Sequence, residues 1–221
     1  MRVLASLAIA VAFATATMRA QTTPNAPPQG APGATTEVSE DRGWSFYATT
    51  YRYIIPDDGS YWQPTVTADR GGLHLEGRYN YEAADTASAW VGWNFSGGDR
   101  LAWELTPMIA GVFGQTTGVA PGYKGAVSWS KLQFYSEGEQ VFDTGESSDS
   151  FSYTWSELTL TPVEWCRFGV AIQQTYAHET ESGSQGGPLV GFTFKNVDFT
   201  AYLFDVDQDR PTFVIAAGVR F

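Results

Sequence analysis

The chain has 221 residues, of which 43% are hydrophobic, 15% are aromatic and only 17% are charged, and 23 are glycine. This composition is typical of many short strands joined by tight turns and argues against a helical enzyme. The 13 basic and 24 acidic residues give a formal charge of -11, which argues against nucleic acid as a partner. Because Cys166 is the single cysteine, an intramolecular disulfide and a cysteine-based zinc or redox motif are excluded. We expect a small packing residue there and predict neither a metal nor a cofactor.

Residues 1–20 have the pattern of a secretory signal peptide. Arg2 precedes an apolar run that is too short to span a membrane, and the small residues after it offer cleavage after Ala16 or Ala20. The next segment, 21–43, is rich in proline and glycine, and most of it carries no charge and no large apolar side chain. Such a segment buries too little surface to offset its ordering entropy, so we expect a disordered extension in the periplasm.

From residue 44 to residue 221, apolar side chains recur at every second position, which indicates strands rather than helices. Clusters of Gly, Pro, Asp and Ser divide this segment into twelve candidate strands: 44–55, 61–69, 73–81, 87–95, 100–113, 119–129, 132–142, 151–160, 165–176, 188–195, 197–204 and 212–221. The division at Ser130 and Lys131 is the weakest, because only a polar pair marks it. Strands in a membrane must close into a barrel, and single-chain bacterial barrels have an even number of strands. We therefore predict an all-β, closed antiparallel transmembrane barrel of twelve strands, with ten or eight as the alternatives.

Alternation alone does not say which face of a strand is inside, so a soluble barrel or sandwich is the competing interpretation. The position of the aromatic residues favours lipid on the outside, because they gather at both strand ends, as in the aromatic belts of membrane proteins. Near the expected periplasmic ends these are Trp93, Phe95, Trp103, Trp129, Trp165, Phe168, Phe194, Phe199 and Phe221. Near the expected outer ends these are Tyr53, Trp62, Tyr79, Tyr81, Phe113, Tyr123, Phe142, Tyr176 and Phe213.

The chain ends on an aromatic residue that is preceded by apolar residues at alternate positions. These residues are Phe213, Ile215, Ala217, Val219 and Phe221. The pattern resembles the C-terminal assembly signal of bacterial outer-membrane β-barrel proteins, and the stretches Gly111–Gly114 and Phe134–Glu139 are similar to small uncharacterised members of that class. The resemblance implies recognition by the outer-membrane assembly machinery, residence in the outer membrane of a Gram-negative bacterium, and contact with the bilayer and lipopolysaccharide. It implies no particular activity.

The face opposite the lipid carries the ionisable residues that we expect to line the lumen. They are His74, Glu76, Arg78, Glu104, Lys124, Glu137, Glu139, Arg167, Lys195, Asp198 and Arg220. Near the inner strand ends, Asp198 is placed to bridge Lys195 and Arg220. Twelve strands leave room for a narrow pore, and outer connections of about five to eleven residues are too short to be obvious plugs.

Three aspartates lie in the last outer connection, at Asp205, Asp207 and Asp209. Their spacing matches the start of an EF-hand loop, but Arg210 and Pro211 replace the required glycine, and no glutamate follows at the twelfth position. We expect a solvated acidic loop, with divalent cations that bridge it to lipopolysaccharide phosphates as the alternative.

These features leave three functions open. The first is a passive, porin-like channel for small polar solutes. The second is a non-conducting barrel that anchors or organises the envelope and has a salt-bridged interior. The third is an outer-membrane lipid-modifying enzyme, whose nucleophile, base and orienting acid would come from one outer loop. Its candidate residues are His178, Ser182 or Ser184, and Glu179 or Glu181.

Overall fold

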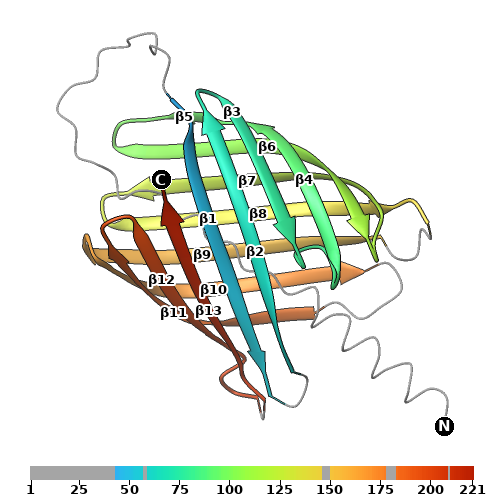
Figure 1. Cartoon of the computed structure of the whole chain (residues 1–221). Coiled ribbons are helices and arrows are strands. Elements are labelled where there is room, and N and C mark those ends of the chain that lie inside the picture. Colours follow the sequence, from blue (N-terminus) through green and yellow to red (C-terminus); the bar gives the residue numbers. More distant parts are fainter. Residues whose placement is uncertain (1–42, 57–58, 146–149, 178–182, 209) are drawn as a thin grey trace.

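The structure is a computed structural model that describes residues 43–56, 59–145, 150–177, 183–208 and 210–221. Its strand segments pair antiparallel in one closed sheet, as Figure 1 shows. The segments are β1 (Ser45–Ile55), β2 (Gly59–Arg70), β3 (Leu73–Tyr79), β4 (Thr86–Trp93), β5 (Phe95–Gly97), β6 (Leu101–Gly114), β7 (Gly118–Trp129), β8 (Leu132–Asp143), β9 (Phe151–Val163), β10 (Cys166–Ala177), β11 (Gly183–Phe194), β12 (Val197–Phe204) and β13 (Thr212–Arg220). No helix in these ranges is long and apolar enough to cross a membrane. The predicted signal peptide and the predicted extension lie outside the described residues, apart from Gly43.

The closed sheet has twelve strands, because β4 and β5 are two parts of one strand. Both pair with β6 in a single register, in which Gly92 faces Met108 and Phe95 faces Leu105. That register places Pro107 of β6 opposite the end of β4, and proline has no N–H to donate to the ladder. The ring closes where β1 pairs with β13, and these two strands lie side by side at the front of Figure 1. The predicted twelve-stranded barrel is therefore confirmed.

The two ends of the barrel differ in the length of their connections. The turn end carries connections of two or three residues after β2, β5, β7, β9 and β11, and the loop end carries connections of three to seven residues. Between β7 and β8 only Ser130 and Lys131 form the turn, because Trp129 pairs with Leu132. Ser130 takes a left-handed backbone conformation there, with φ of 55°, which tight hairpin turns require. The division that the sequence marked most weakly is therefore correct.

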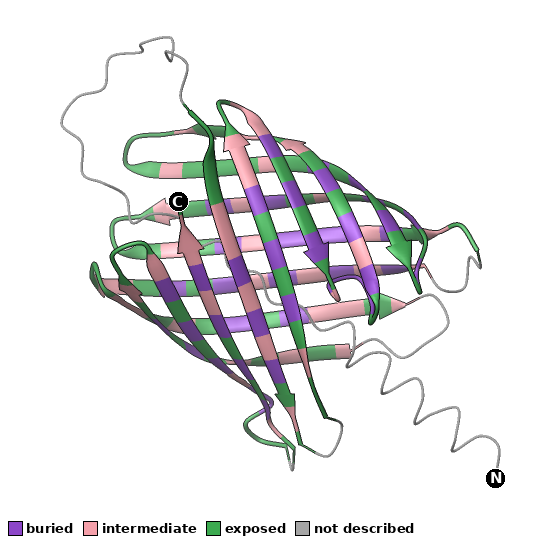
Figure 2. Cartoon of the chain, viewed as in Figure 1, coloured by how far each residue is buried: buried purple, intermediate pink, exposed green. Residues whose placement is uncertain are grey.

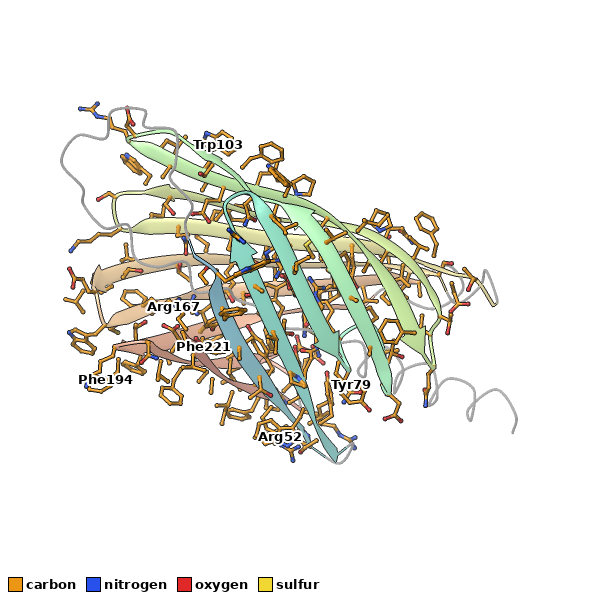
Figure 3. All side chains as sticks on the ribbon, turned by 45° about the horizontal axis from the view of Figure 1, so that its top comes forward. Arg52, Tyr79, Trp103, Arg167, Phe194 and Phe221 are labelled. Atoms are coloured by element: carbon orange, nitrogen blue, oxygen red, sulfur yellow. The ribbon has the colours of Figure 1, made fainter. Side chains whose placement is uncertain are left out.

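Side chains alternate between an interior face and an outward face along the strands, and Figure 2 shows this as bands of buried and exposed residues. The nine aromatic residues predicted near the periplasmic ends are all exposed. Two of them, Trp103 and Phe194, lie at the turn end and point away from the barrel in Figure 3. A soluble barrel buries its apolar face, so this outward apolar surface is the one expected next to lipid.

Two aromatic residues predicted near the outer ends lie inside the barrel instead. Tyr53 is fully buried, because the odd-numbered residues of β1 face inward. Tyr81 is also buried, because β3 ends at Tyr79 and Asn80 then turns the chain with a left-handed φ of 55°. The remaining residues of that predicted belt are exposed, namely Trp62, Tyr79, Phe113, Tyr123, Phe142, Tyr176 and Phe213.

β11 is longer than predicted, since it begins at Gly183 rather than at residue 188. Its first residues are rich in glycine and serine, which favour loops in a sequence, but here they pair with β10. The amide Nε2 of Gln173 donates to Oε1 of Gln185 across that pair at 2.8 Å. The loop predicted over 177–187 is correspondingly shorter.

The last residue of the chain completes the closure of the barrel. The backbone N–H of Phe46 donates to the carbonyl of Phe221 at 2.9 Å, and the N–H of Phe221 donates back at 3.0 Å. Their rings stack with centroids 5.7 Å apart. The residues predicted as an assembly signal therefore lie on the strand that closes the ring, and their role in assembly stays a prediction.

Candidate functional site in the barrel interior

Most of the predicted lumen charges point into the barrel. Seven are buried, namely His74, Glu76, Arg78, Lys124, Glu137, Glu139 and Asp198. Arg167 and Arg220 are partly buried, Glu104 lines an open cavity at the turn end, and Asp198 pairs with Arg220 at 3.0 Å as predicted. The prediction that Lys195 lines the lumen is wrong. Lys195 lies in the turn between β11 and β12, where the strand alternation ends, and it is exposed with its Nζ 5.5 Å from the ring centre of Phe194.

The connection between β3 and β4, residues 80–85, folds into the barrel, and we call it the inward loop. Its buried side chains, none more than 3% exposed, are Tyr81, Glu82 and Ala83. Asn80 holds the loop at its start, since its Nδ2 donates to the carbonyl of Trp62 at 3.0 Å and its Oδ1 accepts from the N–H of Asp85 at 2.8 Å. Asn80 and Asp85 both have left-handed backbones, with φ of 55° and 51°. The outer connections were expected to be too short to be obvious plugs, and this one nevertheless places three side chains in the interior.

Arg78 of β3 links two parts of the barrel wall that are not neighbours. Its Nε donates to Oε1 of Glu76 at 2.5 Å, and its Nη1 donates to Oε2 of Glu139 on β8 at 3.0 Å. The guanidinium lies 4.0 Å from the ring centre of Tyr81 and 4.4 Å from that of Trp90. Because β4, β6 and β7 separate β3 from β8 around the ring, the contact with Glu139 crosses the interior instead of following the wall.

Further donors reach the carboxylates of Glu76 and Glu137. Lys124 of β7 donates to Oε2 of Glu76. Glu137 accepts from the hydroxyl of Tyr81 and, at 2.8 Å, from that of Tyr135. We call the cluster the Arg78 network, and its members are His74, Glu76, Arg78, Tyr81, Lys124, Tyr135, Glu137 and Glu139. Buried charges are tolerated when they are paired and hydrogen-bonded. Within the network Arg78 pairs with Glu76 and Glu139, Lys124 pairs with Glu76, and Glu137 accepts from two tyrosine hydroxyls.

A second buried cluster surrounds Arg167 at the start of β10. The side chain faces the interior in step with the alternation along β10, in which Ala171 and Gln173 are also buried. There its Nη1 donates to Oε2 of Glu157 at 3.1 Å, and its Nη2 donates to the hydroxyl of Thr200 at 2.8 Å. Gly191 on β11 leaves the space for it, because a Cβ there would lie 2.7 Å from Nε of Arg167.

Aromatic side chains complete this second cluster. Oε1 of Glu157 accepts from the hydroxyl of Tyr202 at 2.9 Å and from Nε1 of Trp155 at 3.1 Å. Trp155 meets the rings of Tyr202 and Phe204 edge-on, with centroids 5.3 and 5.4 Å away. We call this cluster the Arg167 network, and its members are Trp155, Glu157, Arg167, Thr200 and Tyr202.

An open cavity of about 620 Å³ lies at the turn end, and we call it the vestibule. It is lined by Ser45, Phe46, Tyr47, Thr67, Asp69, His74, Asn94, Phe95, Ser96, Glu104, Thr106, Lys124, Gly125, Ala126, Tyr135, Arg220 and Phe221. Three of these belong to the Arg78 network, so the network forms the floor of the vestibule. On its wall, Oδ1 of Asp69 accepts from Nδ1 of His74 and Nδ2 of Asn94, both at 2.7 Å. Oδ1 of Asn94 accepts in turn from the hydroxyl of Thr106 at 2.6 Å.

Sequence reasoning missed several polar residues of the interior. They are Asp69, Tyr81, Glu82, Tyr135 and Glu157. For Glu157 a signal was present, because a charge marks the inward side of a membrane strand even where aromatic residues share that side. Tyr81 and Glu82 gave no such signal, since they reach the interior only through the fold of the inward loop.

Two further predicted sites are described in part. His178, Glu179, Glu181, Ser182 and Asp209 lie outside the described residues, and Ser184 is an exposed residue of β11. Asp205 is buried, and burial raises the pKa of its carboxyl, whereas Asp207 is exposed. Within the described residues, no group of three or more His, Cys, Asp or Glu side chains is arranged to hold a metal ion.

Solved structures of outer-membrane porins are similar to this barrel. A KdgM porin has a TM-score of 0.59 at 10% sequence identity, over 79% of this chain and 99% of that chain. A KdgM porin in complex with disordered oligogalacturonate gives the same values. The Acinetobacter baumannii outer membrane protein Omp33 has a TM-score of 0.50 at 11% identity, over 80% of this chain and 98% of that chain. No family model and no curated protein matches the sequence. The chain therefore has a fold that outer-membrane porins share, which agrees with the outer-membrane β-barrel class that its C-terminal pattern resembles.

Proposed function

We propose that this protein is a porin-like channel for small polar solutes in the outer membrane of a Gram-negative bacterium, with the turn end toward the periplasm. The observation that supports this proposal most directly is the vestibule. Its volume of about 620 Å³ lies in the range of small-molecule sites, and charged, amide and hydroxyl side chains line much of it. A barrel that served only as an anchor would gain nothing from an open polar chamber, because filling it with side chains would add packing energy.

The Arg78 network and the inward loop form the constriction of the proposed channel. Arg78 reaches from β3 to Glu139 on β8, and Tyr81 reaches from the inward loop to Glu137. A solute that leaves the vestibule must pass between or displace these side chains, which limits passage to small molecules. The aromatic ring of Tyr81 is the largest group that the inward loop places there.

The interior charges favour cations and neutral polar solutes over anions. The interior carboxylates are Asp69, Glu76, Glu82, Glu104, Glu137, Glu139, Glu157 and Asp198, and the permanently cationic side chains are Arg78, Lys124, Arg167 and Arg220. Low-dielectric walls focus the field of such an excess along a narrow lumen. The oligogalacturonate of the KdgM complex is an acidic chain, and here it would meet this excess of carboxylates.

A non-conducting anchoring barrel is the second candidate function, and a specific observation favours it. Arg78, Glu137 and Glu139 are almost fully buried and pair with one another or with neighbouring hydroxyls. A layer that stays closed in this way would hold separate parts of the wall together and pass no solute.

Conductance in planar bilayers separates the two functions. We expect stepwise conductance from the wild type and larger steps from Tyr81→Ala, because the substitution removes the ring from the constriction. The matched control is Tyr176→Ala, which removes an exposed ring on the outward face of β10 and leaves the step size unchanged. If neither the wild type nor Tyr81→Ala conducts although both proteins are folded, the result contradicts the channel and supports the anchoring barrel.

A further inference from the structure

Both ring nitrogens of His74 face carboxylate oxygens at the floor of the vestibule. Nδ1 lies 2.7 Å from Oδ1 of Asp69, and Nε2 lies 3.1 Å from Oε2 of Glu76. The ring is almost fully buried between these two partners. A neutral imidazole has one N–H donor and one lone pair, so it can donate to only one of two carboxylates. The protonation state of this ring therefore decides whether both contacts are favourable.

The carboxylate of Glu76 is ionised and can only accept. Its Oε1 accepts from Nε of Arg78 at 2.5 Å, and its Oε2 accepts from Lys124 in addition to facing His74. Two cationic donors on one carboxylate favour its negative form. A lone pair on Nε2 of His74 would point at this negative charge. Nε2 therefore carries a proton and donates it to Glu76.

The carboxylate of Asp69 also accepts from the groups that face it. Its Oδ1 accepts from Nδ2 of Asn94 at 2.7 Å, and the hydroxyl of Thr106 fixes the orientation of that amide by donating to its Oδ1 at 2.6 Å. Asp69 lines the open vestibule, and 32% of its side chain is exposed. Imidazole is a much stronger base than a carboxylate, with ordinary pKa values of about 6.5 and about 3.9. The proton between Asp69 and His74 therefore resides on Nδ1.

We propose that His74 is a doubly protonated imidazolium and that its charge helps to set the ion preference of the vestibule; the second part rests on the proposed channel. Apart from tyrosines, the ionisable residues that line the vestibule are Asp69, His74, Glu104, Lys124 and Arg220. With His74 charged, the cations in this lining outnumber the carboxylates, although carboxylates outnumber permanent cations in the interior as a whole. The vestibule then accepts anionic groups of a solute more readily than the constriction does, and His74 reduces the cation preference of the channel.

Nitrogen NMR of the ring tests the charge without reference to conductance. His178 is the only other histidine of the chain, so in His178→Gln every imidazole signal comes from His74. The sample is the untagged barrel, labelled with ¹⁵N-histidine, in detergent micelles at about pH 8, where an unperturbed histidine is neutral. We expect both ring nitrogens to carry a proton. One protonated and one unprotonated nitrogen overturns the proposal.

A pair of substitutions tests whether the contact with Asp69 holds the second proton. In the same background, Asp69→Asn replaces the carboxylate at Nδ1 with a neutral amide, and we expect the ring to carry a single proton at the same pH. Asp207→Asn is the matched control, because it removes an exposed carboxylate from the connection between β12 and β13 at the loop end. It should leave both protons in place. An equal response to the two substitutions overturns the assignment.

The reversal potential in a salt gradient tests the effect on ion preference. His74→Gln, compared with His74 in the His178→Gln background, keeps a hydrogen-bonding side chain and removes the charge. We expect the cation-over-anion permeability ratio to rise about twofold, the effect of one unit charge roughly 8 Å from an ion in water. An unchanged ratio overturns the specificity role, because replacement of a neutral ring changes no charge. A barrel that does not conduct contradicts the proposed channel and this role together, whereas the NMR measurement still decides the charge of His74.

Discussion

Removal of Arg78 should destabilise the barrel more than removal of any outward charge. The side chain is almost fully buried, donates to Glu76 and Glu139, and lies against the rings of Tyr81 and Trp90. Arg78→Met keeps much of the volume but leaves the partner carboxylates without their cation. Loss of one member of a buried ion pair costs about 3 to 5 kcal/mol. We expect a decrease of that size in the free energy of unfolding.

The assay is urea unfolding of the refolded barrel in lipid vesicles, followed by tryptophan fluorescence. Arg52→Met is the matched control, because Arg52 is only half-buried and its guanidinium lies 5.0 Å from the ring centre of Trp62. Glu139→Gln should lower the free energy of unfolding by less than Arg78→Met does, since the amide oxygen still accepts from Arg78. In the double variant the two losses should not add, because the two side chains contact each other. Surface substitutions usually change the free energy of unfolding by no more than about 0.5 kcal/mol. A change as small as that for Arg78→Met would refute the reasoning.

Three further predictions concern packing, assembly and the outward surface. Gly191→Ala should lower the free energy of unfolding by about 1 to 3 kcal/mol, because its Cβ would displace Arg167; Gly77→Ala, with nothing within 4 Å of its Cβ, should change it little. Deletion of Phe221 should reduce the amount of assembled barrel in the outer membrane far more than Phe213→Leu, and equal amounts count against the assembly signal. The mature protein should need detergent and run as a heat-modifiable band on unboiled gels, whereas a monodisperse monomer without detergent would end the membrane interpretation.

The strands and turns could be predicted from the sequence, because the alternation of apolar and polar residues indicates which face of a strand each residue occupies. Outward residues such as Val91 and Trp93 alternate with inward ones, and a period of two has no helical counterpart. Turns of two residues were also visible, even at Ser130 and Lys131, because the hydrophobic alternation stops there. These signals are local, so no tertiary information was needed.

The interior could not be predicted with the same success, because its contacts depend on which walls face each other. Glu139 and Arg78 were both assigned to the lumen, yet their pairing follows only from the closure of the ring. Tyr81 was assigned to the lipid face, because no residue next to it in the sequence indicates the left-handed turn at Asn80. The inward face of β9 was missed for another reason. Its aromatic residues face inward, and only the charge of Glu157 indicates that side.

The reversal potential in a salt gradient tests the proposed channel most directly, measured on the wild type and on the double variant Glu137→Gln with Glu139→Gln. Both carboxylates lie in the constriction, so the account predicts a wild type that conducts with a preference for cations. It predicts that the double variant folds with modest loss of stability and shifts the reversal potential toward anions. Absence of conductance in the wild type, together with a large drop in the unfolding temperature of the double variant, would contradict the channel and identify the interior as a closed, salt-bridged core.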